Sequence, residues 1–285
     1  MIRISIVTIT FQAANTLQRT LDSVSRQRCL PFEHLIIDGA SKDATVAMAK
    51  RYQEAASYRV IVTSEPDSGL YDAMNKGLAR ATGDYIVFLN AGDCLHDERT
   101  LETVIKAAES SRKPEAHSLE AEGQPVSHTE QASSTLPAII YGDTAITDGQ
   151  GHFLHLRRLR PPAHLTWRSF RQGMLVCHQA FYARTDLARQ TPYDLQYRHS
   201  ADVDWCIRIM KEADRQGLPL KNTHTVLADF EDGGNTTLHH RASLMERYRV
   251  MAHHYGHVDT FLLHGWFAVR AVLTKLRVPL LSASE

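Results

Sequence analysis

The sequence predicts an α/β protein with one central, mostly parallel sheet flanked by helices. Short apolar segments alternate with segments whose apolar residues recur at helical spacing. Strands that alternate with helices are typical of parallel sheets with right-handed crossovers. Carboxylates and turn residues follow several of the apolar segments, and ligands of such sheets bind beyond the carboxyl ends of the strands.

The first part of the chain supplies four strands with a helix after each of the first three. The expected strands are Ile2–Ile9, Glu33–Ile37, Tyr58–Thr63 and Asp84–Leu89. The expected helices begin at Asn15 or Thr16, where Leu17, Leu21 and Val24 recur at helical spacing, at Lys42, ending near Tyr52, and at Tyr71, ending at Arg80.

The second part continues the pattern less regularly. Strands are expected over Pro137–Tyr141, His152–Arg158 and Met174–Tyr182, and helices over Asp202–Gln216, Arg241–Tyr255 and Val258–Leu281. Residues 110–136 are polar, so they cannot bury enough apolar surface to offset their ordering entropy, and we expect a surface insertion. Residues 1–237 are therefore expected to form one domain, followed by an amphipathic helical region over 238–285.

Composition excludes several classes of protein. The 285 residues include 32 basic and 32 acidic side chains, and this balance argues against a nucleic-acid partner. The four cysteines form no CxxC pair, which favours reduced cytosolic thiols over a zinc site or disulfides. The N-terminus reads as a strand rather than a signal peptide, and no apolar segment has membrane-spanning length. We expect a cytoplasmic protein.

Carboxylates follow three of the expected strands, at Asp38, at Glu65 and Asp67, and at Asp93. We expect the four to share one hollow at the sheet edge. Asp38 can accept a hydrogen bond from a planar base such as uracil, while Glu65 and Asp67 can reach ribose hydroxyls or the base edge. The alternative is an ordinary Asp-Gly turn at Asp38 and a plain loop at Glu65. Further nucleotide-binding candidates near the same edge are Thr8, Thr10 and Asn90.

Asn90-Ala91-Gly92-Asp93 is the sharpest single motif. A diphosphate carries dense negative charge, and a cation held by hard oxygen ligands neutralises it. Asp93 is expected to bind Mn²⁺ or Mg²⁺, with diphosphate oxygens and water filling the remaining positions. The alternative is that Asp93 begins a turn before a helix over Glu98–Glu109.

Two further motifs provide candidates for catalysis and acceptor contact. Asp202 and Asp204 stand at the start of a helix, where a carboxylate stays anionic and can serve as the general base of sugar transfer. The alternative for this pair is a helix cap. His178 and Gln179 lie in an apolar segment and either contact the acceptor or a phosphate or are satisfied core residues. Gly233–Thr237 is either a diphosphate loop or a turn.

The C-terminal segment carries an apolar stripe at helical spacing. Its members are Val258, Leu262, Trp266, Val269, Leu273, Leu276 and Leu280. Between Arg241 and Arg277 six basic residues stand against Glu246 and Asp259. Such a helix either lies on an anionic membrane surface, through residues 258–281, or packs on the domain or on a second subunit of a homo-oligomer.

The order and spacing of these motifs resemble family 2 glycosyltransferases of the GT-A fold. The resemblance is dense over residues 2–105 and is closest to bacterial enzymes of capsule and exopolysaccharide assembly, including the colanic acid type. It rests on Thr8–Phe11, Asp38–Asp43, Glu65–Gly69, Tyr71–Gly77, Gly83–Tyr85 and Leu89–Asp93.

This resemblance implies a nucleotide-diphosphosugar donor, Mn²⁺ or Mg²⁺, and inversion at the anomeric carbon. It assigns Asp38, Glu65 and Asp67 to the nucleotide, Asp93 to the metal, and Asp202 to the base. The family often has two adjacent carboxylates at the metal motif, where this chain has Gly92 first, and often Glu-Asp at the base, where this chain has Ala201 before Asp202. Asp204 therefore stays a rival base.

The expected function is transfer of a sugar, with a UDP-sugar as the expected donor, to a hydroxyl of a saccharide or lipid-linked saccharide during cell-surface polysaccharide synthesis. Its place is the cytoplasm, in peripheral contact with the inner face of the plasma membrane. One alternative is a nucleotidyltransferase, which needs a Gly-rich phosphate loop that the segment after the first strand does not supply. The other is a non-catalytic nucleotide-sugar-binding module, which Gly92 keeps open.

Overall fold

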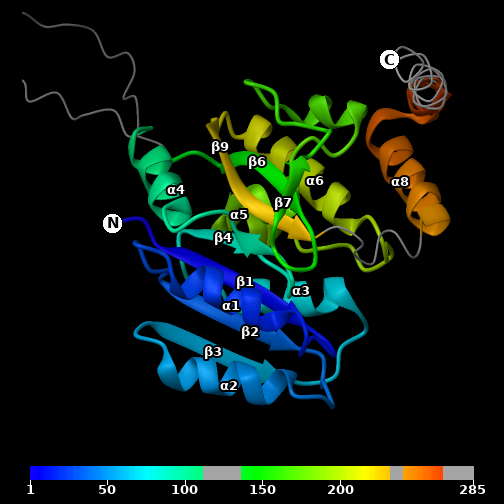
Figure 1. Cartoon of the computed structure of the whole chain (residues 1–285). Helices are drawn as coiled ribbons and strands as arrows, with labels where there is room; N and C mark the ends of the chain where they lie inside the picture. The colour runs from blue at the N-terminus through cyan, green and yellow to red at the C-terminus, as the bar shows by residue number, and fades with distance from the viewer. Residues whose placement is uncertain (112–135, 232–239, 266–285) are drawn as a thin grey trace, which may run out of the picture.

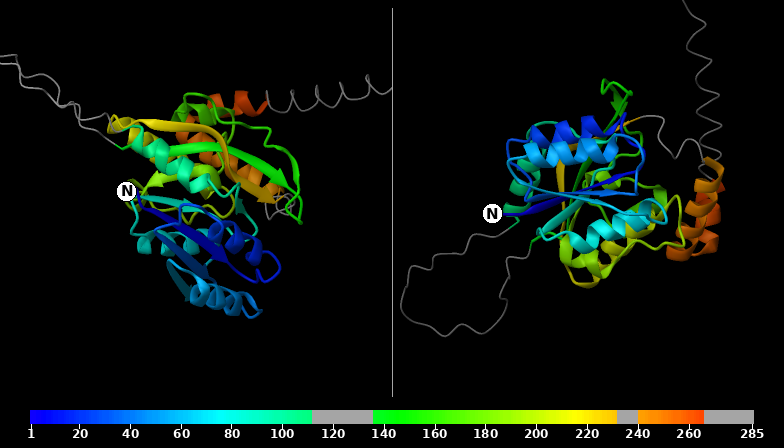
Figure 2. Two further views of the ribbon diagram at one scale, coloured as in Figure 1. Left: turned by 60° about the vertical axis from the view of Figure 1, so that its left-hand side comes forward. Right: turned by 90° about the horizontal axis from the view of Figure 1, so that it is seen from below.

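The fold is built around one sheet with helices on both of its faces (Figure 1). The computed structural model describes residues 1–111, 136–231 and 240–265. The first part contains β1 (Ile4–Thr10), α1 (Leu17–Ser25), β2 (Glu33–Asp38), α2 (Thr45–Ala55), β3 (Arg59–Ser64), α3 (Leu70–Arg80) and β4 (Tyr85–Phe88). The strand–helix alternation expected from the sequence is confirmed here. Figure 2, right, shows α1 and α2 on one face of the sheet and α3 on the other.

These four strands pair in parallel, and their register aligns their carboxyl ends. β1 lies between β2 and β4, and β3 pairs with the outer side of β2. Thr10 is opposite Asp38, and Asp38 is opposite Ser64. Because parallel strands end at one edge of a sheet, the loops that carry the expected nucleotide ligands begin side by side.

The second part extends the same sheet beyond β4, with both antiparallel and parallel pairs. Its elements are β5 (Cys94–Leu95), α4 (Thr100–Glu109), β6 (Ile139–Thr147), β7 (Phe153–Leu156), β8 (Phe181–Arg184), α5 (Thr185–Gln190), α6 (Ala201–Arg215) and β9 (Leu220–Glu231). The strand order is β3-β2-β1-β4-β8-β6-β9-β5, and β7 pairs with β6. β8 runs antiparallel to β4 and β6, whereas β9 runs parallel to β6.

The expectation of a strand over Met174–Tyr182 is wrong for the first part of this segment. Residues His178–Ala180 form a 3-10 turn, and the strand covers only Phe181–Arg184. Met174, Leu175 and Val176 are buried without being in a strand. Their apolar character therefore reports burial in a loop and not an extended backbone. The sequence pattern also did not predict β9, whose residues are largely polar.

An aromatic cluster fixes α6 against the sheet. The Trp205 ring stacks on Tyr193 at a centroid distance of 4.8 Å and meets Phe88 of β4 edge-on at 5.7 Å. Phe181 of β8 also meets Trp205 edge-on at 5.7 Å. Truncating such a buried Trp to Ala costs about 3–5 kcal/mol. This packing places the first turn of α6, with Asp202, next to the ends of β4 and β8.

The C-terminal part consists of α8 (His240–Tyr255) and a further helical segment over residues 257–265. α8 contacts α6, and its Val250 and Met251 are buried. The Tyr255 hydroxyl donates to the Trp167 carbonyl at 2.5 Å. Among the residues described, no helix has the length and apolarity needed to span a bilayer. Gly233–Thr237, the expected helix beyond 265 and most of 110–136 lie outside the described residues.

Candidate active site

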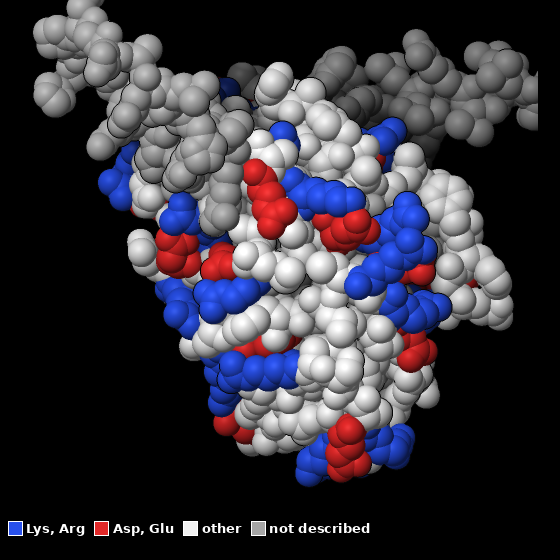
Figure 3. Space-filling model, turned by 90° about the vertical axis from the view of Figure 1, so that its left-hand side faces the viewer, with Lys and Arg blue, Asp and Glu red and all other residues white. Residues whose placement is uncertain are grey.

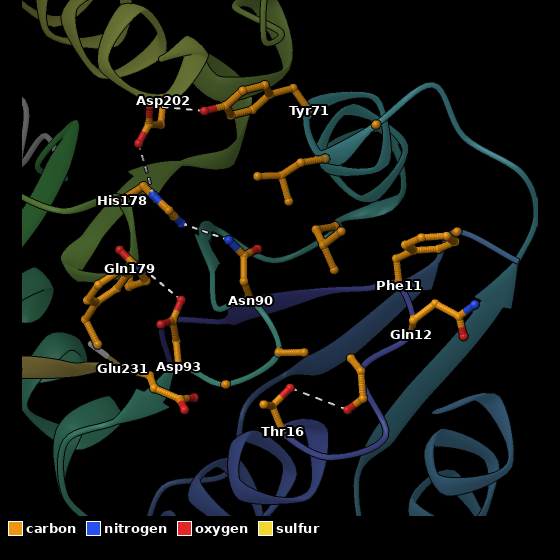
Figure 4. Close-up of a pocket in the computed structure, with 18 of the residues that line it drawn as sticks. Phe11, Gln12, Thr16, Tyr71, Asn90, Asp93, His178, Gln179, Asp202 and Glu231 are labelled. Atoms are coloured by element: carbon orange, nitrogen blue, oxygen red, sulfur yellow. Dashed lines mark hydrogen bonds and ion pairs between the residues drawn. The ribbon is translucent and has the colours of Figure 1, made fainter. Parts of the chain in front are cut away.

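A cavity of about 850 Å³ opens where the parallel strands end. Its walls come from the segments after β1 and β4, the start of α3, the 3-10 turn before β8, the first turn of α6 and the end of β9 (Figure 4). Six of the residues expected from the sequence line it: Asp67, Asn90, Asp93, His178, Gln179 and Asp202. The other expected residues, Thr8, Thr10, Asp38, Glu65 and Asp204, do not line it.

Asp38 is fully buried and turns back into the sheet edge. Its carboxylate accepts hydrogen bonds from the Thr10 hydroxyl at 2.9 Å and the Ser64 hydroxyl at 2.7 Å. The backbone N–H and hydroxyl of Ser41 donate to it at 2.9 and 2.6 Å. A buried carboxylate needs its lone pairs satisfied, and these four donors do so. Asp38 thereby fixes the loop after β2 from outside the cavity, and our expectation that all four carboxylates share one hollow is wrong for it.

Glu65 and Thr8 also face elsewhere. The Glu65 carboxylate lies 3.4 Å from the Lys76 ammonium and 3.7 Å from the Arg80 guanidinium, on the outer side of α3. Basic residues one helical turn apart therefore draw Glu65 away from the cavity. The hydroxyl of Thr8 is buried and hydrogen-bonded to Nε2 of His34 at 2.8 Å. The expected shared hollow thus contains only two of its four carboxylates, Asp67 and Asp93.

Asp67 reaches the cavity because residue 39 is glycine. A Cβ at Gly39 would stand 2.5 Å from Oδ2 of Asp67 and 3.3 Å from the Phe11 ring. The Gly69 N–H donates to the other oxygen of Asp67 at 2.9 Å. The Phe11 ring is mostly exposed at the lip of the cavity, on the side away from Asp93 (Figure 4). A carboxylate beside an exposed ring suits a planar base with its ribose.

Asp93 is a buried carboxylate at the other end of the cavity. Burial raises the pKa of Asp93 to about 6, and the nearby Glu231 carboxylate adds to this shift. The Gln179 amide donates to Oδ2 of Asp93 at 2.8 Å and opposes the shift. A cation that replaces the proton would stabilise the ionised form of this group.

Glu231 comes from the end of β9 and lies against Gly92 (Figure 4). A Cβ at Gly92 would stand 3.1 Å from Oε2 of Glu231, and the φ of Gly92 is +106°, a region that favours glycine. The Arg19 guanidinium donates to the Gly92 carbonyl at 2.6 Å and pairs with Glu231 at 3.2 Å. The space beside the first position of the metal motif is therefore filled by a carboxylate from a distant strand.

The donor set fits a hard divalent cation only in part. Asp93 and Glu231 line one cavity with two carboxylates, while no group of three His, Cys, Asp or Glu in residues 1–111, 136–231 and 240–265 is arranged to hold a metal ion. Mg²⁺ is usually held by one or two carboxylates together with substrate phosphates and water. Asp93 and Glu231 supply this number of carboxylates, and phosphate oxygens and water would have to supply the remaining ligands.

Asp202 is held by a chain of polar side chains across the cavity (Figure 4). Its Oδ1 accepts from the Tyr71 hydroxyl at 3.2 Å and from the Val203 N–H at 2.9 Å. Its Oδ2 lies 3.6 Å from Nδ1 of His178, whose Nε2 accepts from the Asn90 amide at 3.3 Å. Because the Nδ2 group of Asn90 can only donate, the proton of a neutral imidazole is on Nδ1, facing Asp202. Burial works to raise the pKa of Asp202, but His178, the Arg247 guanidinium and the N–H of Val203 together outweigh it and hold that pKa below its ordinary value.

Asp204 is on a different side of α6. Its carboxylate pairs with Nε of Arg208 at 2.6 Å and with Nε2 of His254 in α8 at 2.7 Å. The Lys211 ammonium donates to Nδ1 of His254 at 3.0 Å, so Nε2 carries the proton that faces Asp204. Burial also lowers the pKa of His254, which keeps the imidazole neutral. Asp204 thus joins α6 to α8.

Sequence reasoning missed Tyr71, Glu231 and Phe11 as lining residues. Glu231 stands in Phe230-Glu231-Asp232-Gly233-Gly234, where acidic and turn residues after an apolar stretch signal a strand end. Tyr71 is in the first turn of α3, directly after Ser68-Gly69. Nothing in the sequence separates Phe11 from an ordinary exposed aromatic residue.

Solved structures with the same arrangement include transferases of the GT-A type, and the expected fold class is confirmed. Residues 1–349 of Staphylococcus aureus TarS in complex with UDP-GlcNAc superpose with a TM-score of 0.60 at 12% identity, covering 82% of this chain and 59% of that one. The mannosyltransferase PcManGT from Pyrobaculum calidifontis, in complex with GDP-Man and Mn²⁺, gives 0.57 at 14% identity, covering 99% of this chain and 81% of that one.

The sequence profile described as Glycosyl transferase family 2 matches residues 5–182, and the chain belongs to this family of glycosyltransferases. It is 31% identical over 234 residues to the PGL/p-HBAD biosynthesis glycosyltransferase of Mycobacterium bovis BCG, covering 81% of this chain and 77% of that protein. It is 27% identical over 241 residues to the amylovoran biosynthesis glycosyltransferase AmsB of Erwinia amylovora, covering 79% of this chain and 70% of AmsB.

Proposed function

We propose that the protein transfers a sugar, with inversion, from a nucleotide-diphosphosugar to a hydroxyl of a saccharide or lipid-linked saccharide. The observation that carries this proposal is that three carboxylates line one cavity: Asp67, which lies with Phe11 against Gly39, Asp93 at the end away from Phe11, and Asp202 across from Asp93. These positions match the three needs of the reaction, which are a nucleoside site, a diphosphate site and a base.

The donor's nucleoside would lie between Phe11 and Asp67, with Asp38 acting as the residue that positions the loop after β2. A UDP-sugar suits this site because uracil is small and presents an N–H to an acceptor group. Thr10 supports Asp38 through its hydroxyl. Glu65 contributes through its ion pairs with α3, which fix the loop that carries Asp67.

The diphosphate would lie toward Asp93 and Glu231. These two residues would hold Mn²⁺ or Mg²⁺, which when bound acts as a Lewis acid that stabilises the departing nucleoside diphosphate. Gln179 orients the Asp93 carboxylate through its hydrogen bond at 2.8 Å. Arg19 keeps Glu231 at the cavity wall, against Gly92.

Asp202 would accept the proton of the acceptor hydroxyl while that oxygen forms its bond to the anomeric carbon. Its lowered pKa keeps the carboxylate ionised at neutral pH, as a general base requires. Tyr71 and His178 hold one carboxylate oxygen each. One displacement from the face opposite the leaving group inverts the configuration of the sugar.

The acceptor belongs to cell-surface polysaccharide synthesis in this proposal, since AmsB is named for amylovoran biosynthesis. The reaction would take place in the cytoplasm, in peripheral contact with the inner face of the plasma membrane.

The test is binding followed by turnover. UDP- and GDP-sugars are titrated calorimetrically into the protein with and without Mn²⁺, and release of nucleoside diphosphate is then measured with saccharide acceptors. We expect donor binding that strengthens with Mn²⁺ and acceptor-dependent release that Asp202→Asn abolishes. Donor binding without any release, under all acceptors, would instead support the non-catalytic binding module. Formation of a sugar nucleotide from a nucleoside triphosphate would support the nucleotidyltransferase.

A further inference from the structure

The two C-terminal helical segments carry large apolar side chains on their outer side. Leu244, Met245, Val258, Phe261 and Leu262 expose between 45% and 74% of their surface. Figure 1 and the right-hand view of Figure 2 place these segments beyond α6, away from the sheet. Single exposed apolar residues are ordinary, but five within 19 residues of chain indicate a surface that binds a membrane or another protein.

The spacing of these residues gives each segment an exposed stripe. Met245, Arg249 and His253 follow one another at four-residue intervals along α8, and all three are exposed. Residues 257, 258, 261, 262 and 265 form a second exposed stripe in the segment that follows. Residues four apart in a helix share a face. We call these two stripes together the C-terminal face.

In this region the acidic side chains are paired with other parts of the protein, whereas several basic side chains face solvent. Its two acids are engaged by the body of the protein, since Glu246 accepts from the backbone N–H groups of Arg198 and His199, and Asp259 pairs with Arg171. Apart from Asp259, whose side chain is 47% exposed but paired with Arg171, the exposed ionisable residues of the described segment 242–265 are basic: Arg249, His253 and His257. In contrast, Figure 3 shows acidic and basic side chains intermixed over the side of the molecule opposite α8.

We infer that the C-terminal face docks on the anionic surface of a lipid bilayer. Apolar side chains flanked by basic ones, with the two nearby carboxylates paired to Arg171 and to backbone N–H groups, match a surface that buries its apolar groups at the headgroup boundary and attracts anionic lipids. The sequence continues in the same composition, because residues 266–285 contain Arg270, Lys275 and Arg277 and a single acid, Glu285.

Contacts made by Glu246 and His254 of α8 connect the helix that carries part of the C-terminal face to the side of the cavity that contains Asp202. Glu246 of α8 holds the backbone of His199, which lines the cavity two residues before α6 begins at Ala201. His254 of α8 holds Asp204 in the first turn of α6. A bilayer bound at α8 would therefore hold Asp202 at a fixed position relative to the lipid surface. This link to a lipid-linked acceptor rests on the proposed function, whereas the docking itself does not.

The test is sedimentation of the full chain with vesicles. We expect binding to vesicles of phosphatidylcholine and phosphatidylglycerol at 3:1, and at least about tenfold weaker binding to phosphatidylcholine alone. Phe261→Ser with Leu262→Ser, and separately Arg249→Glu, should each weaken binding about tenfold. The matched control is Phe153→Ser with Leu154→Ser, which removes an equally exposed apolar pair from β7 and should leave binding unchanged.

Two results would overturn the inference. One is equal binding of wild type and the Phe261/Leu262 variant to the anionic vesicles. The other is a stable dimer in light scattering that this variant converts to a monomer, because the face would then belong to a second copy. Calorimetric binding of UDP is measured for every variant. A protein that binds vesicles and no nucleotide would contradict the proposed function and leave the docking intact.

Discussion

The substitutions Asp202→Asn and Asp204→Asn separate the proposed base from its rival. Both remove a carboxylate from the first turn of α6 and keep the size of the side chain. Asp202 lines the cavity, whereas Asp204 is bonded to Arg208 and His254 on another side of the helix. We therefore expect Asp202→Asn to lose transfer, and Asp204→Asn to keep transfer and lose stability.

The magnitudes follow from these contacts. Loss of a general base lowers kcat by about 10²- to 10⁴-fold. In Asp204→Asn the amide oxygen can satisfy only one of the two donors, and losing one hydrogen bond to a charged group costs about 1.5–3 kcal/mol. For a chain of this size each kcal/mol lowers Tm by about 2–4 °C, so the expected loss is about 3–12 °C.

The assay is nucleoside diphosphate release, measured well below the lower of the two Tm values, together with thermal unfolding followed by circular dichroism. His254→Leu is the matched control, because it removes the α8 donor to Asp204 at a similar side-chain size and should also lower Tm without affecting transfer. Loss of transfer in Asp204→Asn with an unchanged Tm would refute the reasoning and make Asp204 the base.

Three further predictions concern the sheet and the two ends of the cavity. Burial lowers the pKa of His34 to about 3, below its value in the unfolded chain, so protons favour unfolding as the pH falls below about 6.5. Between pH 7 and 5 the wild type should lose about 2 kcal/mol more unfolding free energy in urea than His34→Gln, and equal losses would contradict this. Gly39→Ala should push the Asp67 carboxylate aside and weaken UDP binding about tenfold in calorimetry at an unchanged Tm, whereas unchanged binding would exclude Asp67 from the donor site. Gln179→Ala removes a hydrogen bond that lowers the pKa of Asp93, so that pKa should rise further above about 6. Mn²⁺ binding should then weaken more steeply between pH 8 and 6 in the variant than in wild type. Parallel pH profiles of Mn²⁺ binding for the two proteins would contradict this prediction.

The first half of the fold could be predicted from the sequence because each strand is a short apolar segment followed by turn residues. Glu33–Ile37 was expected and Glu33–Asp38 is found, for example. The pattern fails at β9, whose sequence Leu220–Glu231 is mostly polar and whose extended backbone is supported by pairing with β6. Pairing of this kind joins residues about 80 positions apart, and local periodicity does not report it.

The candidate site was predictable in its position and less so in its members. Strand ends located the cavity, and Asp67, Asp93 and Asp202 line it. Asp38 follows a strand in the same way, but hydroxyl groups from neighbouring strands satisfy its carboxylate, and only the sheet register brings those groups together. A carboxylate after a strand is thus evidence for a site only where no donors from neighbouring strands can reach it.

The segment His178–Ala180, where a strand is expected and a 3-10 turn is found, shows how the cavity is assembled. Successive side chains of a strand point to opposite faces, so a strand through His178 and Gln179 would bring only one of them to the cavity. The 3-10 turn over His178–Ala180 brings both. His178 accepts from Asn90 while Gln179 donates to Asp93, so two adjacent residues engage both ends of the segment Asn90–Asp93 after β4. Because His178 also faces Asp202, this turn sets the distance between the diphosphate end of the cavity and the proposed base.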